Sequence, residues 1–489
     1  MPSFSVLINS IVFGHKGVVC QDSLRSRCAR SSVILAAAAF IERGMRLVRN
    51  MIVARFLAKE DFGLMAIIFV VAQLLDASTD AGIKPSIIQS KQGSEEGYLN
   101  VAWWLQTLRG IGLFCIAFFV APWICEFYKA PELLGWLRLS FLAIVFNALL
   151  SPRAHVMEKN FLFGRTAVLM QGGSFLGTVI TIVLAVIWRD VSALVIGYIA
   201  EPVFRTLLSY ILCPFRPKFR IDKEKLRSLS QFAKGALGLP LLSCIAFQTD
   251  VIVLGRMVSK ADLGMYYLAV AFVQLPVDFF RKVIGTFLLP AFAETQDDLQ
   301  KLQRGLLEIT SKTTLLSMPF ITFLALFAAP VLKLMYGTPY VAVSAPFTFL
   351  AWYILTRTQS NTLGLVFLAL GRPDIQRRCV FIRLIVILAL IYPAILLFGL
   401  CGAAATVLLA EVANLIIQIF GIRQITGLSF ADYLRSYRIG MLISLIVVVM
   451  TVPLKLLQTE SLILSIGVGG LSCLIAYFVG FMMIRHSDK

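Results

Sequence analysis

Charged side chains occur inside long apolar segments of this 489-residue chain. An ionised side chain at the middle of a bilayer costs about 2.5–3.5 kcal/mol on insertion scales, so it usually faces a cavity or a partner. The cations that could bind an anionic, phosphate-bearing substrate are Arg46, Arg49, Arg109, Arg281 and Lys282. The carboxylates that could couple an ion or gate a cavity are Asp76, Asp80, Asp250 and Asp278. Arginine suits phosphate and pyrophosphate because its guanidinium can donate two parallel hydrogen bonds.

Other charges within the apolar segments receive no substrate role. Glu201 and Arg205 lie one helical turn apart and are interpreted as a structural ion pair. Further charges of this kind, without an assigned function, are Arg138, Arg357, Arg383 and Glu411. For the arginines of the first span, the alternative is that they reach to the membrane surface. For the aspartates, the alternative is helix packing against a partner.

The sequence gives little indication of a catalytic site, a metal site or a nucleotide-binding site. The nine cysteines are scattered without a Cys-x-x-Cys pair, and the three histidines have no ligand-like spacing. No Gly-x-x-x-x-Gly-Lys-Ser/Thr motif is present, which argues against ATP-driven transport by this chain alone. A membrane-bound polymerase or ligase would need a large outer loop, whereas the expected outer loops have a few residues each. We therefore expect no enzyme, no metal and no cofactor.

The composition predicts a membrane protein. Hydrophobic residues make up 58% of the chain and charged residues 15%, whereas a soluble domain carries about a quarter charged residues. A helix needs about 20 apolar residues to cross the hydrocarbon core. We therefore predict an all-α integral membrane protein with about fourteen transmembrane helices. The expected spans cover residues 33–57, 62–88, 99–121, 133–155, 165–188, 191–212, 229–253, 263–290, 306–332, 343–370, 379–399, 401–422, 437–457 and 461–484.

The spans are expected to form two pseudo-symmetric six-helix lobes followed by two C-terminal helices. The expected parts are a cytoplasmic N-terminal arm (1–32), an N-lobe (33–212), a basic cytoplasmic linker (213–228), a C-lobe (229–422), and the last two spans with the C-terminal tail (423–489). Lysine and arginine concentrate in the arm and in loops after even-numbered spans, which by the positive-inside rule predicts that both termini are cytoplasmic. The same rule accounts for most of the net charge of +18 without a nucleic-acid partner.

An internal repeat supports this division. Residues 55–75 and 256–276 share an Arg-x-x-x-Lys-x-Asp-x-Gly skeleton at an offset of 201 residues. Because six spans separate the copies, the two halves have the same orientation, and substrates of such transporters bind between repeats near the middle of the membrane. The offset makes Arg49 equivalent to Asp250 and Asp80 equivalent to Arg281. We hypothesise ion pairs between the lobes that form or gate a cavity. The alternative is that short apolar turns look alike by chance.

Several short stretches together carry a family resemblance. They are Ala54-Arg55-Phe56-Leu57, Glu60-Asp61-Phe62-Gly63, Asp80-Ala81-Gly82, Ile88-Gln89, Gln248-Thr249-Asp250, Leu254-Gly255-Arg256, Leu263-Gly264-Met265-Tyr266, Leu289-Pro290-Ala291 and Gly371-Arg372-Pro373. In sum the chain resembles, over residues 33–485, the polysaccharide flippase branch of the multidrug/oligosaccharidyl-lipid/polysaccharide exporter superfamily. Ala58-Lys59 departs from the glycine-containing first turn of many relatives.

The resemblance implies a flippase of the bacterial cytoplasmic (inner) membrane that works by ion-coupled alternating access. Its substrate would be an undecaprenyl-pyrophosphate-linked oligosaccharide for exopolysaccharide or O-antigen-type polysaccharide biosynthesis. Spans one, two, seven and eight would line the cavity, where the candidate charges fall. The implied partners are this lipid-linked anionic glycan, H+ or Na+ as coupling ion, membrane lipid and polysaccharide assembly proteins. The alternative is a drug or small-solute antiporter on a related multi-helix fold. The sugar and the coupling ion stay open.

Overall fold

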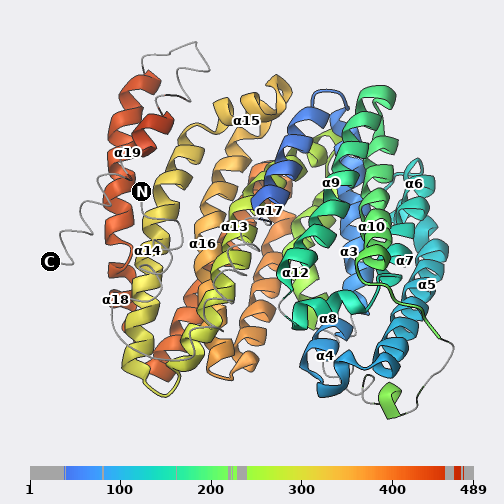
Figure 1. Ribbon diagram of the computed structural model, residues 1–489. Helices are drawn as coiled ribbons and strands as arrows, with labels where there is room; N and C mark the ends of the chain where they lie inside the picture. Colours follow the sequence, from blue (N-terminus) through green and yellow to red (C-terminus); the bar gives the residue numbers. More distant parts are fainter. Residues whose placement is uncertain are drawn as a thin grey trace. The chain divides into compact units, whose positions relative to one another are not determined.

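The structure is a computed structural model, and the part of the chain that it describes is helical (Figure 1). The described residues are 38, 40–79, 82–160, 162–218, 222, 224–227, 229, 239–456, 467, 469–474 and 477. Within them nine helices are long and apolar enough to cross a membrane, or ten if the bent pair Leu133–Ala148 and Arg153–Lys159 is one span. The prediction of an all-α membrane protein is confirmed, and the total of about fourteen helices stays a prediction.

Contacts between Cα atoms divide the chain into two compact units. The first unit comprises Met1–Arg49, Ile68–Cys244 and Lys282–Phe287, and the second comprises Asn50–Ile67, Ile245–Arg281 and Leu288–Lys489. The predicted lobe boundaries remain predictions, and each unit is described by itself below.

Most of the first unit consists of helices between residues 68 and 212. After a helix at residues 40–53, its elements are α3 (Lys59–Ser78, in part), α4 (Ile83–Gln89), η1 (Lys91–Ser94), α5 (Glu96–Phe127), α6 (Leu133–Ser140), α7 (Leu142–Ala148), α8 (Arg153–Lys159), α9 (Phe163–Trp188) and α10 (Val191–Leu212). Glycines bring the α9 and α10 backbones together, as is common between membrane helices. A Cβ at Gly177 would lie 2.9 Å from the Cβ of Glu201.

Two predicted spans of this unit are interrupted, and the prediction of continuous helices there is wrong. The expected span 62–88 ends at Ser78, and α4 begins only after Gly82, whose φ of 59° suits a residue without a Cβ. The expected span 133–155 is divided into α6, α7 and α8, with Pro152 as the N-cap of α8. Proline suits the start of a helix, where its missing N–H group would have no helical partner and its fixed φ is already helical. The direction changes by 58° at this point.

The basic segment after α10 is packed against the first turns of α5. The Asn100 side chain accepts a hydrogen bond from the Lys218 N–H at 2.7 Å and donates one to the Lys218 carbonyl oxygen at 2.5 Å. Phe215 is buried in a hydrophobic cluster with Tyr98. Lys225 donates to Glu95 at 2.8 Å, and this hydrogen bond raises the pKa of Lys225. These contacts hold the segment against the start of α5 within the first unit.

The second unit contains a 54-residue helical segment, α17, that is interrupted by a kink. Its elements are the start of α3, most of α12 (Leu239–Met257) and of α13 (Lys260–Glu294), and then α14 (Leu299–Leu326), α15 (Ala328–Tyr336), η2 (Thr338–Val343), α16 (Ser344–Ala369), α17 (Pro373–Thr426), α18 (Phe430–Arg435) and α19 (Arg438–Leu456). The 54 residues of α17 would measure about 80 Å if straight, more than twice the hydrocarbon thickness.

The α17 helix is broken at Gly399, where φ is 56° and ψ is −133°. A Cβ at Gly402 would overlap the carbonyl oxygen of Ala394. Those residues would lie about 12 Å apart along a straight helix, so the chain turns back on itself. We call residues 373–398 the first arm and 400–426 the second arm of this hairpin. The predicted division into spans 379–399 and 401–422 is confirmed.

The two repeat copies meet inside the second unit, where α3 and α13 start. A Cβ added at Gly63 would overlap the carbonyl oxygen of Lys260, and one added at Gly264 would overlap that of Lys59. Because 63 pairs with 264 and 59 with 260 at the offset of 201, the contact is reciprocal. We call it the glycine crossing.

Candidate functional site

Arg46 belongs to a cluster of four charges in the first unit. Its Nη2 lies 2.8 Å from Glu201 Oε1 and 3.3 Å from Glu42 Oε1. Arg205 donates to the same Glu201 oxygen from one turn further along α10. The Nε atoms of Arg46 and Arg205 are buried and have no hydrogen-bond partner among the described residues. Two cations and two carboxylates balance, while two N–H groups remain free to bind an anion.

The structure brings together two residues for which the sequence suggested different roles. Arg109 on α5 donates to the Asp76 carboxylate, to the Asp76 backbone carbonyl at 3.0 Å and to Thr79 Oγ1 at 2.9 Å. The side chain of Asp76 is 61% exposed and that of Arg109 21%. A cation near the last turn of α3 also complements the dipole of that helix. Arg109 therefore binds the end of α3, and its partly exposed guanidinium lies at the same surface as the Asp76 side chain.

The other predicted site residues are only partly placed. Arg49 and Asp278 are each intermediate in burial. Asp80 lies outside the described residues, as do the side chains of Arg281 and Lys282, whose backbone belongs to α13. The hypothesised pairs of Arg49 with Asp250 and of Asp80 with Arg281 stay predictions.

Asp250 is buried in the second unit. It lies on α12 with 5% of its surface exposed, and its Oδ2 accepts a hydrogen bond from the Tyr266 hydroxyl on α13 at 2.9 Å. A buried carboxylate needs such partners, because desolvation strongly disfavours an ionised group. The prediction that Asp250 couples an ion or gates a cavity stays a prediction.

Close to Asp250 in the structure lies an ion cluster to which the sequence analysis assigned no function. Glu411 receives Arg383 Nε at 2.7 Å and Arg357 Nη1 at 3.4 Å. Arg383 also donates to the backbone carbonyl of Ala246, one turn before Asp250 on α12. Glu411 and Arg383 are at most 1% exposed. Together with Asp250, the cluster contains two cations and two carboxylates.

An aromatic ring supports both arginines of this ion cluster. The guanidinium carbons of Arg357 and Arg383 lie 3.6 Å and 4.2 Å from the centroid of the Phe247 ring. Such contacts stabilise desolvated cations by about 2 kcal/mol or more. Three elements, α12, α16 and α17, therefore meet around one set of buried charges. A buried set of charges costs more than apolar packing would, which makes this cluster a candidate functional site.

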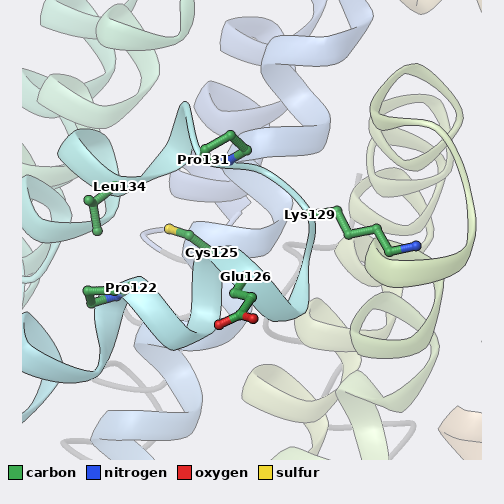
Figure 2. Close-up of a pocket in the computed structure, with 6 residues that line it drawn as sticks. All are labelled: Pro122, Cys125, Glu126, Lys129, Pro131 and Leu134. Atoms are coloured by element: carbon green, nitrogen blue, oxygen red, sulfur yellow. The ribbon is translucent and has the colours of Figure 1, made fainter.

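In the first unit, a surface pocket of about 420 Å³ lies where α5 ends (Figure 2). It is lined by Pro122, Cys125, Glu126, Lys129, Pro131 and Leu134. Lys129 points away from the other lining side chains (Figure 2). None of the predicted site residues lines this pocket. Within the described part of the chain, no group of His, Cys, Asp or Glu is arranged to hold a metal ion.

The apolar helices and their buried ion pairs define a multi-pass membrane protein. Residues 52–345 match the family model described as "Polysaccharide biosynthesis protein", and the chain belongs to this family. The expected family resemblance is thereby confirmed.

Among curated proteins, the chain is similar to the lipopolysaccharide biosynthesis protein WzxC of Escherichia coli (strain K12), with 24% identity over 426 residues and 86% of each chain covered. It is also similar to the succinoglycan biosynthesis transport protein ExoT of Rhizobium meliloti (strain 1021), with 25% identity over 298 residues and 60% of each chain covered.

Two solved structures share the fold. The lipid II flippase MurJ in an inward closed conformation aligns with a TM-score of 0.76 and 14% identity, covering 93% of this chain and 99% of that one. A multidrug resistance MATE family transporter of the MOP superfamily, in an inward-facing conformation, aligns with a TM-score of 0.64 and 13% identity, covering 81% and 98%. At these identities the likeness shows a common fold.

Proposed function

We propose that this chain is a flippase that moves a lipid-linked glycan across the bacterial inner membrane during polysaccharide biosynthesis. One observation carries the proposal: the family match, residues 52–345, includes both repeat copies, 55–75 and 256–276. The polysaccharide family therefore shares the duplicated membrane scaffold itself. The relative ExoT, named a transport protein, supports a transporter in preference to an enzyme.

The proposed substrate is an undecaprenyl-pyrophosphate-linked oligosaccharide. The relatives are named for different polymers, among them lipopolysaccharide and succinoglycan. We infer that their substrates share the lipid phosphate and differ in the sugar. Guanidinium groups recognise phosphate through paired donors. We assign this recognition to Arg46, Arg49, Arg109, Arg281 and Lys282. The free Nε of Arg46 and the half-buried guanidinium of Arg109 support the assignment.

The proposal includes ion-coupled alternating access with both termini in the cytoplasm, and polysaccharide assembly proteins as partners. The carboxylates Asp76, Asp80, Asp250 and Asp278 are the candidate sites for coupling or gating. The pairing of Asp76 with Arg109 supports it, because an anionic substrate could displace the carboxylate from the guanidinium. A gradient ion could then bind the released carboxylate.

Deletion of the gene in its own bacterium, with complementation from a plasmid, tests this function. We expect loss of a surface polysaccharide and accumulation of its lipid-linked precursor, both reversed by the intact gene. Arg109→Ala should fail to complement, whereas Arg138→Ala, which removes an arginine stacked on Phe118 outside the proposed site, should succeed. A deletion strain with normal polysaccharide, no precursor and increased drug sensitivity would favour the antiporter alternative.

A further inference from the structure

A line of polar side chains runs through the interior of the second unit, between α16 and the two arms of α17. Gln418 Nε2 donates to Gln376 Oε1 at 3.3 Å. Asn414 Nδ2 donates to Ser360 Oγ at 2.8 Å and to Glu411 Oε1 at 3.2 Å. Gln418, Asn414, Ser360 and Glu411 are each at most 2% exposed. We call these five residues the polar line.

The spacing of these residues explains why they align. Glu411, Asn414 and Gln418 occupy one face of the second arm, because they are three and seven residues apart. From Glu411 to Gln418 the helix rises about 10 Å, which is a third of the hydrocarbon thickness. Gly364 on α16 leaves room for the line, since a Cβ there would lie 3.0 Å from Gln376 Nε2.

Two atoms of the polar line require a further partner. Asn414 Oδ1 and Gln418 Oε1 are buried and have no hydrogen-bond partner among the described residues. A buried carbonyl oxygen without a partner is costly in an apolar interior, and ordered water is the usual way in which proteins satisfy it. Two such oxygens about one helical turn apart on the same face form a suitable site for a file of water molecules.

The two ends of the polar line differ in character. Gln376 is partly exposed and lies in the first turn of the first arm, next to the loop at Gly371 and Arg372, where the positive-inside rule predicts the cytoplasm. The other end is Glu411, in the ion cluster beside Asp250. The line therefore extends from an aqueous edge to buried carboxylates.

We propose that the polar line holds ordered water and conducts protons between the edge at Gln376 and the carboxylate of Asp250. In each cycle a hydronium ion gives its proton to the Asp250 carboxylate, leaving water and a neutral carboxylic acid, and the reverse step returns it. Glu411 stays ionised because two guanidinium groups bind it. The groups that face Asp250 or its cluster are Tyr266 on α13, Tyr353 and Arg357 on α16, and Arg383 and Glu411 on α17.

Proton binding changes the charge of the ion cluster from balanced to a net positive charge, since Arg357 and Arg383 then face Glu411 alone. The coupling ion of the proposed flippase would thus be the proton. This biological role rests on the proposed function, whereas the file of water molecules and the protonation of Asp250 are independent of it.

The test uses purified full-length protein in lipid nanodiscs without a glycan substrate. After a rapid shift to acidic pH, infrared difference spectra follow the C=O stretch of a newly protonated carboxylic acid. We expect this band in the intact protein and its loss in Asp250→Asn. Gln418→Leu should slow its appearance by about tenfold or more, because the change removes hydrogen-bonding groups that the proton must pass.

The chain offers a matched control, Gln359→Leu. Gln359 on α16 is also fully buried, and both its amide atoms lack a partner among the described residues, but it lies on a different face from Ser360 and Gly364. This variant should protonate as fast as the intact protein. Gln418→Asn, which keeps an amide and adds no carboxyl group to the measured band, should recover most of the rate.

The proposal is overturned if Gln418→Leu protonates at the rate of the Gln359→Leu control, or if the band persists in Asp250→Asn. A high-resolution structure of the intact protein gives a second test that needs no variant: water density must contact Asn414 Oδ1 and Gln418 Oε1. Because neither measurement involves a glycan, they can succeed even if the deletion experiment refutes the flippase function, and the reverse also holds.

Discussion

Arg383 and Glu411 lie on opposite arms of the α17 hairpin, and their side chains meet at 2.7 Å with almost no exposure to solvent. The Gln376 and Gln418 pair is centred on the same point of the chain, beside the break at Gly399. Two pairs with a common centre fix the register of the two arms. The ion pair thus stabilises the packing of two arms that follow each other directly in the chain.

Loss of Glu411 should destabilise the protein strongly. Glu411→Gln leaves Arg357 and Arg383 buried with Asp250 as their only carboxylate, and breaking a buried pair by removing one partner costs about 3–5 kcal/mol. The double variant Arg383→Met with Glu411→Gln keeps the charge count of the cluster balanced, because one cation, Arg357, and one carboxylate, Asp250, remain. Thermal unfolding in detergent should show a higher midpoint for the double variant than for Glu411→Gln, and the opposite order would contradict the charge count.

The Arg109–Asp76 pair should matter for transport more than for stability. Asp76 is mostly exposed, and exposed ion pairs contribute about 0–1 kcal/mol. Arg109→Ala should therefore unfold near the temperature of the intact protein while complementing a deletion strain poorly. Arg109→Lys keeps the charge without the paired donors and should give an intermediate level of surface polysaccharide. Full complementation by Arg109→Ala would remove this residue from the substrate site.

Replacing either glycine of the glycine crossing should lower the stability of the protein. A methyl group at Gly63 or Gly264 would overlap a backbone carbonyl that cannot rotate away, and overpacking typically costs about 1–3 kcal/mol. We expect Gly63→Ala and Gly264→Ala to lower the unfolding temperature to a similar extent. Gly112→Ala is the control, because nothing lies within 4 Å of a Cβ there. Unequal effects would argue against a reciprocal contact.

The break in α17 should require glycine at position 399 because of the backbone conformation there. A Cβ at Gly399 would meet nothing within 4 Å, yet its φ of 56° with ψ of −133° is a region that only glycine adopts readily, and such strain costs about 1–3 kcal/mol. Gly399→Asn should therefore destabilise the protein. Gly427→Asn should be milder, because its φ of 76° and ψ of 8° lie in the left-handed region that asparagine tolerates.

Orientation can be measured with single cysteines in a cysteine-free background. Lys129 and Arg216 are both exposed, the first after α5 and the second after α10. In intact spheroplasts a membrane-impermeant maleimide should label Lys129→Cys, and Arg216→Cys should react only after the membrane is opened. The reverse pattern would invert the predicted topology.

Much of the helical order is readable from the sequence, because long apolar runs are bounded by charges or turns. The predicted span 191–212 coincides with α10, and the turn after 399 is correct. The break before α4 falls in a polar stretch from Asp76 to Gly82, whereas the break before α8 follows the apolar pair Leu149 and Leu150, so hydropathy alone does not locate both breaks. There, Pro152 and the left-handed Gly82 are the N-caps at which α8 and α4 begin.

The charge pairs were harder to predict, since most of them join helices that are distant in sequence. Arg46 and Glu201 are 155 residues apart, and only the packing of the helices brings them together. Arg383 and Glu411 are only 28 residues apart, but a turn placed at Leu400 does not pair them, because they lie 17 and 11 residues from it. The register of the two arms therefore comes from the structure and not from the position of the turn.

The glycine crossing has a consequence for how the molecule is assembled. Each glycine comes from a different half of the gene, and each needs the main chain of the other half as its neighbour. A gene cut between residues 218 and 239 would yield two fragments that each carry one glycine. The interlock could then form only when both fragments are made in the same cell.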